Sequence, residues 1–146
     1  AQLFLPILKE KGYDCEMKRL TYIVSLIKER INFPADLWEQ ANFFFEAPIE
    51  YDEKSLKKRW KPESPQYLTE LCDVLNGLDD FSKVEENEKV VLDWVASKEY
   101  HLGTMMNSFR ITLVGAAKGP HIFNIIDILG KEETLSRVRR ALEIIK

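Results

Sequence analysis

The segment Phe-Arg-Ile-Thr-Leu-Val at residues 109–114 decides the fold class of this 146-residue chain. Its β-branched and aromatic residues favour a strand by intrinsic propensity. A strand is stable only when it pairs with others, and no second segment of similar character occurs in the sequence. Most of the remaining chain has the apolar spacing that is typical of amphipathic helices. We therefore predict that residues 109–114 are helical and that the fold is all-α, with no significant sheet.

Apolar side chains recur at three- and four-residue intervals, which places them on one face of each expected helix. Pro34 suits the first turn of a helix that runs to residue 45. Gly130 is predicted to end a helix in the left-handed conformation, and residues 131–134 to begin the last helix. The apolar positions expected on buried faces are Leu20, Ile23, Ile27, Ile31, Leu68, Leu71, Cys72, Leu75, Leu78, Val90, Val91, Trp94, Val95, Ile122, Ile125, Ile126, Leu129, Leu135, Val138, Leu142 and Ile145.

The run Lys-Pro-Glu-Ser-Pro at residues 61–65 is the clearest interruption of the helical pattern. Two prolines three positions apart break any helix that would cross them. Ser64 suits the N-cap of the next helix and Pro65 its first turn. We place a boundary here between two helical subdomains, residues 1–62 and residues 63–146.

Charge is unevenly distributed along the chain. The formal net charge is −3, which argues against a general nucleic-acid coat and against a DNA partner. Residues 1–62 carry a net +1, residues 63–102 a net −7 and residues 103–146 a net +3. Within the acidic part, Glu85, Glu86 and Glu88 are expected early in a helix and on a solvated face. A polyanion would be repelled by the middle of the chain and attracted to its two ends.

Several observations predict a cytoplasmic protein without a membrane partner. No apolar run approaches the roughly 18–20 residues that a membrane helix needs. The first residues lack the basic and cleavage-site features of a signal peptide. Cys15 and Cys72 lie far apart and lack the close spacing of zinc ligands, so we expect both to be reduced and in or near the core.

The sequence offers poor material for an enzyme active site. It contains two histidines, His101 and His121, and none of the glycine-rich phosphate loops, nucleophile elbows or zinc-binding helix motifs. We therefore expect no catalytic residue, no metal site and no cofactor-binding residue. From its residues alone the chain is interpreted as a helical binding module.

Several motifs, in order and over nearly the whole chain, resemble the C-terminal end of bacterial glutamyl-tRNA synthetases, which are class I aminoacyl-tRNA synthetases. Ser108 and the sequence Thr-Leu-Val-Gly at 112–115 stand where the family has Pro and Ala-Leu-Thr-Gly; both changes keep the spacing. The motifs that carry the resemblance are Ile27–Arg30, Leu37, Phe43–Phe45, Glu50–Lys54, Asn107–Gly115, Gly119–Phe123 and Ile128–Leu135.

The resemblance implies that the chain is the anticodon-binding part of a longer ligase. It implies an all-helical architecture in two packed subdomains and supports a helix at residues 109–114. The partners implied are the anticodon loop of tRNA(Glu) and the catalytic domain of the same polypeptide. ATP and Mg would be used by the full-length enzyme, which attaches glutamate to tRNA, and not by these residues.

The resemblance also implies which residues contact RNA. Arg30 stands where discriminating synthetases carry the arginine that reads the first anticodon base, a cytosine. Arg110 and the loop at residues 118–122 stand beside the other two bases. Arginine offers a rigid five-donor fork, and unstacked loop bases are the usual target of sequence-specific RNA recognition. The expected anticodon-binding residues are Arg30, Arg110, Lys118, Gly119, Pro120, His121 and Ile122.

The residues themselves support this placement and also leave alternatives. Arg110 lies inside an apolar segment, which is unusual for a purely solvated arginine. The alternative for Arg110 is an ion pair at the core edge, and for Arg30 a cation in a last helical turn. Lys118 is alternatively an ordinary loop lysine, and His121 a helix-start residue with a structural hydrogen bond.

The alternative function comes from another class: a helical protein-interaction domain that docks a partner through apolar helix faces and binds no nucleic acid. Salt dependence separates the two hypotheses. RNA binding weakens steeply with salt, and apolar docking does not.

Overall fold

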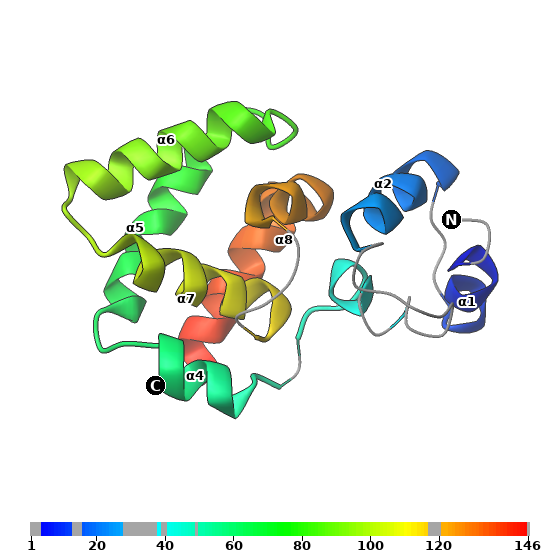
Figure 1. The fold of residues 1–146 in the computed structure, drawn as a ribbon, viewed down its shortest axis with the longest axis horizontal. Helices are drawn as coiled ribbons and strands as arrows, with labels where there is room; N and C mark the ends of the chain where they lie inside the picture. The colour runs from blue at the N-terminus through cyan, green and yellow to red at the C-terminus, as the bar shows by residue number, and fades with distance from the viewer. Residues whose placement is uncertain are drawn as a thin grey trace.

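The structure, a computed structural model, describes residues 4–12, 16–27, 38, 41–48, 50–116 and 121–145. Within these residues it contains α-helices, one 3-10 helix and no strand (Figure 1), which confirms the all-α fold class. The elements are α1 (Phe4–Glu10), α2 (Met17–Ile27), the 3-10 helix η2 (Asn42–Phe44), α4 (Glu53–Arg59), α5 (Ser64–Asn76), α6 (Val84–Ser97), α7 (Leu102–Val114) and α8 (Ile122–Ile144).

The helices form two groups (Figure 1). In the larger group, α7 and α8 pack against each other and both contact α5 and α6, while α4 packs on α7. In the smaller group, α1 and α2 contact each other at the opposite end of the molecule. The helix η2 lies between the two groups and contacts α8. The helix α8 therefore connects the larger group to η2.

Residues 109–114 are helical, as predicted, and form the second half of α7. The helix begins after His101, whose ring Nδ1 lies 3.1 Å from the backbone N of Thr104, and it ends at Gly115 with φ +91°. Ile111 and Thr112 are both fully buried because α4, α5, α6 and α8 pack around α7. Burial on several sides favours the helix over the strand preference of its β-branched residues.

The turn at Gly130 differs from the prediction. Its φ of +82° is positive, as expected, but its ψ of 168° is extended and not left-handed helical. Gly130 therefore joins two helical segments of α8 across a kink and does not end the first in a left-handed cap. Just after the kink, the Lys131 ammonium donates to the carbonyl of Asn76, the last residue of α5, at 3.1 Å.

The start of α5 also differs from the prediction by one residue. Glu63 is the N-cap, and Ser64 is the first helical residue. The Ser64 hydroxyl accepts a hydrogen bond from the backbone N–H of Lys61 at 2.9 Å. It also lies 2.7 Å from the hydroxyl of Ser108 on α7, and both serines are fully buried. A long-range partner thus engages the side chain that sequence reasoning had assigned to a local cap.

Contacts cross the boundary expected at residue 62. The short helix α4 begins after Asp52, which is its N-cap and accepts from the backbone N of Ser55 at 3.0 Å. The backbone N–H of Asp52 donates to the carbonyl of Gly115 at 2.7 Å. These contacts hold α4 against the end of α7. The division into residues 1–62 and 63–146 stays a prediction.

The buried side chains form one cluster that includes residues from both groups of helices. The stripe from Leu68 to Leu78 is buried, as predicted, and Cys72 is a free, buried thiol. On α6, Val91 and Val95 are buried, but Val90 is 47% exposed, so its assignment to the buried face was wrong. One helical step of about 100° turns Val90 away from the core. The expectations for Cys15, Ile31 and Pro34 fall outside the described residues.

Candidate nucleic-acid interface

Three of the seven expected RNA-binding residues lie in the described part of the chain. Arg110 is on α7, His121 is the N-cap of α8, and Ile122 is the first residue of α8. Because α7 and α8 pack against each other, these residues belong to one helix pair. The other four, Arg30, Lys118, Gly119 and Pro120, lie outside the described residues.

Arg110 lies on the stripe of α7 that reaches solvent. Its neighbours Phe109 and Ile111 are fully buried, whereas Arg110 itself is partly exposed. Met106 and Val114, one helical turn away on either side, are also partly exposed. The arginine within an apolar segment thus occupies the position where helical geometry directs a side chain outward.

His121 is engaged by the acidic helix α6. Its Nε2 atom lies 2.8 Å from Oε2 of Glu88, and its ring centroid lies 5.7 Å from that of Phe123. The carbonyl of His121 accepts from the backbone N–H groups of Asn124 and Ile125, at 3.1 and 3.2 Å. The structural hydrogen bond that sequence analysis gave as the alternative role is therefore present, and the ring remains about half exposed.

Ile122 is almost entirely buried. The residue as a whole is 2% exposed, and its side chain belongs to the core. The first N–H groups of a helix have no partner within the helix, and its dipole favours negative charge there. Burial nevertheless leaves Ile122 itself almost no surface for a contact with RNA.

Sequence analysis did not identify the buried cation Arg137 of α8, which is 3% exposed. Its Nη1 atom donates to the carbonyls of Phe43, in η2, and Leu113, in α7, at 2.6 and 2.9 Å. Its Nε atom donates to Glu133 Oε2 at 2.6 Å. Burial lowers the pKa of Arg137, and the Glu133 carboxylate opposes that shift. The i,i+4 spacing of Glu133 and Arg137 was a visible signal for the ion pair, but not for the burial.

A second polar contact joins the two groups of helices. The amide of Asn124 on α8 donates to the Tyr22 hydroxyl on α2 at 2.6 Å. Burial is the main cause that raises the pKa of Tyr22. Asn124 precedes the Gly130 kink and Arg137 follows it, so both segments of α8 are tied to the first half of the chain.

The last turn of α4 carries a cluster of basic residues. Lys57, Lys58 and Arg59 in its last turn are all exposed. Because α4 packs on α7, these cations are on an element that directly contacts the helix of Arg110. Phosphate groups are attracted to such clusters.

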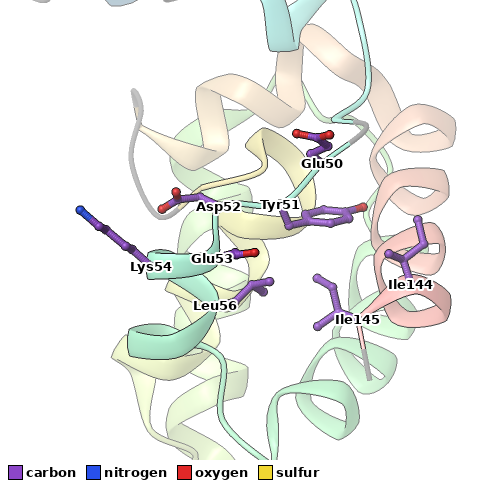
Figure 2. A pocket seen from close by; sticks show the side chains of 8 residues that line it. All are labelled: Glu50, Tyr51, Asp52, Glu53, Lys54, Leu56, Ile144 and Ile145. Carbon is purple, nitrogen blue, oxygen red and sulfur yellow. The ribbon is translucent and has the colours of Figure 1, made fainter.

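A hollow of about 960 Å³ next to α4 has a different character (Figure 2). Glu50, Asp52, Glu53 and Lys54 line it, and the side chains of Asp52 and Lys54 lie on the side away from Ile144 and Ile145. Tyr51 points toward Ile144 and Ile145. The excess of negative charge makes this hollow unsuitable for a polyanion.

The described residues hold no group of three or more His, Cys, Asp or Glu side chains that could bind a metal ion. None of the helices in this part of the chain combines the length and the apolar content of a membrane span.

Comparisons with known proteins show that the chain is similar to an anticodon-binding domain and to part of glutamate–tRNA ligases. The family model described as an anticodon binding domain matches residues 1–142. The glutamate–tRNA ligase of Phocaeicola vulgatus is 57% identical over 146 residues, which are 100% of this chain and 29% of that protein. The corresponding protein of Bacteroides fragilis is 53% identical with the same coverage.

A solved structure is also similar. The crystal structure of a glutamate tRNA ligase from Elizabethkingia meningosepticum, in complex with its amino acid, superimposes with a TM-score of 0.88 at 34% identity. The match covers 99% of this chain and 29% of that one. The chain thus spans less than a third of the length of these relatives.

Proposed function

The chain belongs to the anticodon-binding domain family, and from this premise we propose that it is the part of a glutamate–tRNA ligase that binds the anticodon loop of tRNA(Glu). The match to the family over residues 1–142 supports the binding function. The similarity to glutamate–tRNA ligases over the whole chain supports the amino-acid specificity. Both favour RNA recognition over the protein-docking alternative.

The observation that carries this proposal is the position of Arg110. It lies on the solvent-reaching stripe of α7, which packs between α4, with its three exposed cations, and α8. An arginine in this position can donate hydrogen bonds to a base, while the cations of α4 attract phosphate groups. The remaining contacts of the proposal are Arg30 to the first anticodon base, and Lys118, Gly119, Pro120, His121 and Ile122 to the other two.

The chemistry of the whole ligase belongs to the rest of the polypeptide in this proposal. ATP, with Mg, would activate glutamate in a catalytic domain that these 146 residues do not include, and the reaction would take place in the cytoplasm. The purified chain should then be folded and helical but unable to catalyse glutamate-dependent pyrophosphate exchange. Measurable exchange would contradict the proposal.

The direct test is binding of a synthetic stem-loop that carries a glutamate anticodon beginning with cytosine. We expect saturable binding that weakens with salt, with a log–log slope of roughly −0.7 per single-strand phosphate neutralised. A stem-loop of the same length with an unrelated anticodon is the control. Equal binding of both RNAs, or binding insensitive to salt, would contradict anticodon recognition.

A further inference from the structure

The contact between Glu88 and His121 joins a residue of the acidic segment to the start of α8. Glu85 and Glu86, in the first turn of α6, are exposed, as expected for a solvated face. Glu88 instead is partly buried, and its side chain is 34% exposed. Its carboxylate oxygen lies 2.8 Å from His121 Nε2. One glutamate of the segment that should repel RNA therefore reaches a residue of the candidate interface.

The geometry of this contact restricts the imidazole. At 2.8 Å, Nε2 carries the proton and donates to the carboxylate, so that the other nitrogen, Nδ1, is the one left for a further partner. No hydrogen bond to Nδ1 is found within the part of the chain that the structure describes. The ring is held a second time by Phe123, at 5.7 Å between centroids and 46° between planes.

We infer that Glu88 is a positioning residue for RNA recognition: it holds the His121 ring so that Nδ1 and the exposed face of the ring are oriented to meet an anticodon base. This inference rests on the proposed function. A free histidine at the start of a helix would have to be ordered when RNA binds, which costs side-chain entropy. Glu88 orders it beforehand, and its contact with Nε2 decides which nitrogen is offered.

The inference predicts an effect with the opposite sign to simple electrostatics. Removal of any carboxylate near a polyanion weakens repulsion and should tighten RNA binding slightly. Removal of Glu88 also releases the His121 ring, and loss of one such hydrogen bond corresponds to a weakening of about three- to tenfold. Glu88→Ala should therefore weaken binding even though it makes the protein less negative.

The test compares Glu88→Ala and Glu88→Gln with Glu85→Ala, a matched loss of one exposed carboxylate from the same helix. Binding is measured with the stem-loop described above and with loops altered at one anticodon base. We expect Glu88→Ala to weaken binding of the cognate loop and to reduce discrimination at one of the last two bases. Glu88→Gln, whose amide oxygen still accepts from Nε2, should retain most of both. Glu85→Ala should leave affinity unchanged or slightly higher.

The double variant Glu88→Ala/His121→Ala completes the test, because Glu88 should act only through His121. The loss caused by Glu88→Ala should disappear when His121 is already alanine. The inference is overturned if Glu88→Ala behaves like Glu85→Ala or if the two losses add. It is also overturned if the melting temperature falls while base discrimination is kept. Failure of the unaltered protein to bind the cognate loop would overturn the proposed function instead, so the two failures are distinguishable.

Discussion

Arg137 donates a hydrogen bond to the carbonyl of Leu113 at 2.9 Å, so that a buried cation of α8 holds the last turn of α7. The same guanidinium nitrogen reaches the carbonyl of Phe43 in η2. The last carbonyls of a helix have no partner within it, and a cation is favourable at that end. One side chain thus satisfies the end of the helix that carries Arg110 and ties it to the first half of the chain.

Replacement of Arg137 should therefore be strongly destabilising. Arg137→Ala leaves two main-chain carbonyls without their donor and should lower the free energy of unfolding by about 2–5 kcal/mol. Urea denaturation measures this change. Arg139→Ala, at an exposed position of the same helix, should change it by no more than about 0.5 kcal/mol. Equal effects of the two substitutions would show that the buried contacts contribute little.

Charge reversal at Arg110 should weaken binding of the cognate anticodon stem-loop. Arg110→Glu removes the guanidinium fork and places a carboxylate on the outward stripe of α7. Reversal of Glu86 on α6 should leave binding unchanged or slightly tighter, because it removes repulsion. Affinities are compared at one salt concentration, with circular dichroism as the check on folding. If the Glu86 variant loses binding while Arg110→Glu keeps it, the proposal that RNA binds at the outward stripe of α7 is wrong.

Arg30→Gln should relax discrimination at the first anticodon base. The substitution keeps a polar, helix-compatible side chain but removes the charge and the fork. A bidentate base contact contributes on the order of 1–3 kcal/mol of discrimination, a DNA-derived figure applied here to RNA. The measurement is the ratio of charging efficiencies, by the full-length ligase, of tRNAs that differ only at that base. An unchanged ratio in both Arg30→Gln and Arg30→Ala would show that Arg30 has a structural role and does not recognise the base.

Gly130→Ala should destabilise the fold through backbone strain alone. The φ of +82° with ψ 168° is a region that only glycine adopts easily, and a non-glycine residue there costs about 1–3 kcal/mol. An added Cβ would meet nothing within 4 Å, so no clash contributes. Gly77→Ala, where φ is −80°, is the control and should be near neutral. A neutral Gly130→Ala in thermal unfolding would mean that the kink relaxes without cost.

Acid sensitivity should depend on Tyr100. Its hydroxyl donates to Glu70 Oε2 at 2.7 Å, and this bond is the main cause that holds the pKa of Glu70 below its usual value. A lowered folded-state pKa gives stability that is present at neutral pH and is lost as the pH falls through that pKa. Tyr100→Phe should therefore lose less stability than the parent between pH 7 and pH 3.

The comparison is made by urea denaturation at both pH values. Tyr67→Phe, which alters the ring stacked on Tyr100 at 4.1 Å between centroids, is the matched control. It should keep the acid sensitivity of the parent. If Tyr100→Phe does the same, Glu70 is not a source of the pH dependence.

The helices could be predicted from the sequence because their signals are local. The stripe from Leu68 to Leu78, the start of α4 at Asp52 and the break near Gly130 all follow from spacing, capping and backbone freedom within a few residues. The same local rules were one step wrong at Ser64, whose hydroxyl bonds to Ser108, and at Val90, which faces solvent. Local sequence patterns do not show which distant residue a side chain contacts.

The candidate site also combines features that the sequence predicts with features that only the folded structure shows. Arg110 and His121 were proposed from motifs that resemble a family, and the structure adds the partial exposure of Arg110 and the partners of His121. The contact of Glu88 with His121 was not visible, because α6 approaches the start of α8 only in the folded chain.

The sequence by itself therefore determined the all-α fold class, the breaks at residues 61–65 and near Gly130, and the basic character of the two ends of the chain. Only the tertiary structure showed which charged side chains are buried and bonded within the fold. Periodicity describes one helix at a time, so it shows neither the burial of Arg137 nor the contact between Glu88 and His121. Packing of α8 against α7, η2 and α6 buries Arg137 and partly buries Glu88. A buried charge needs specific partners, and its partners come from distant parts of the chain.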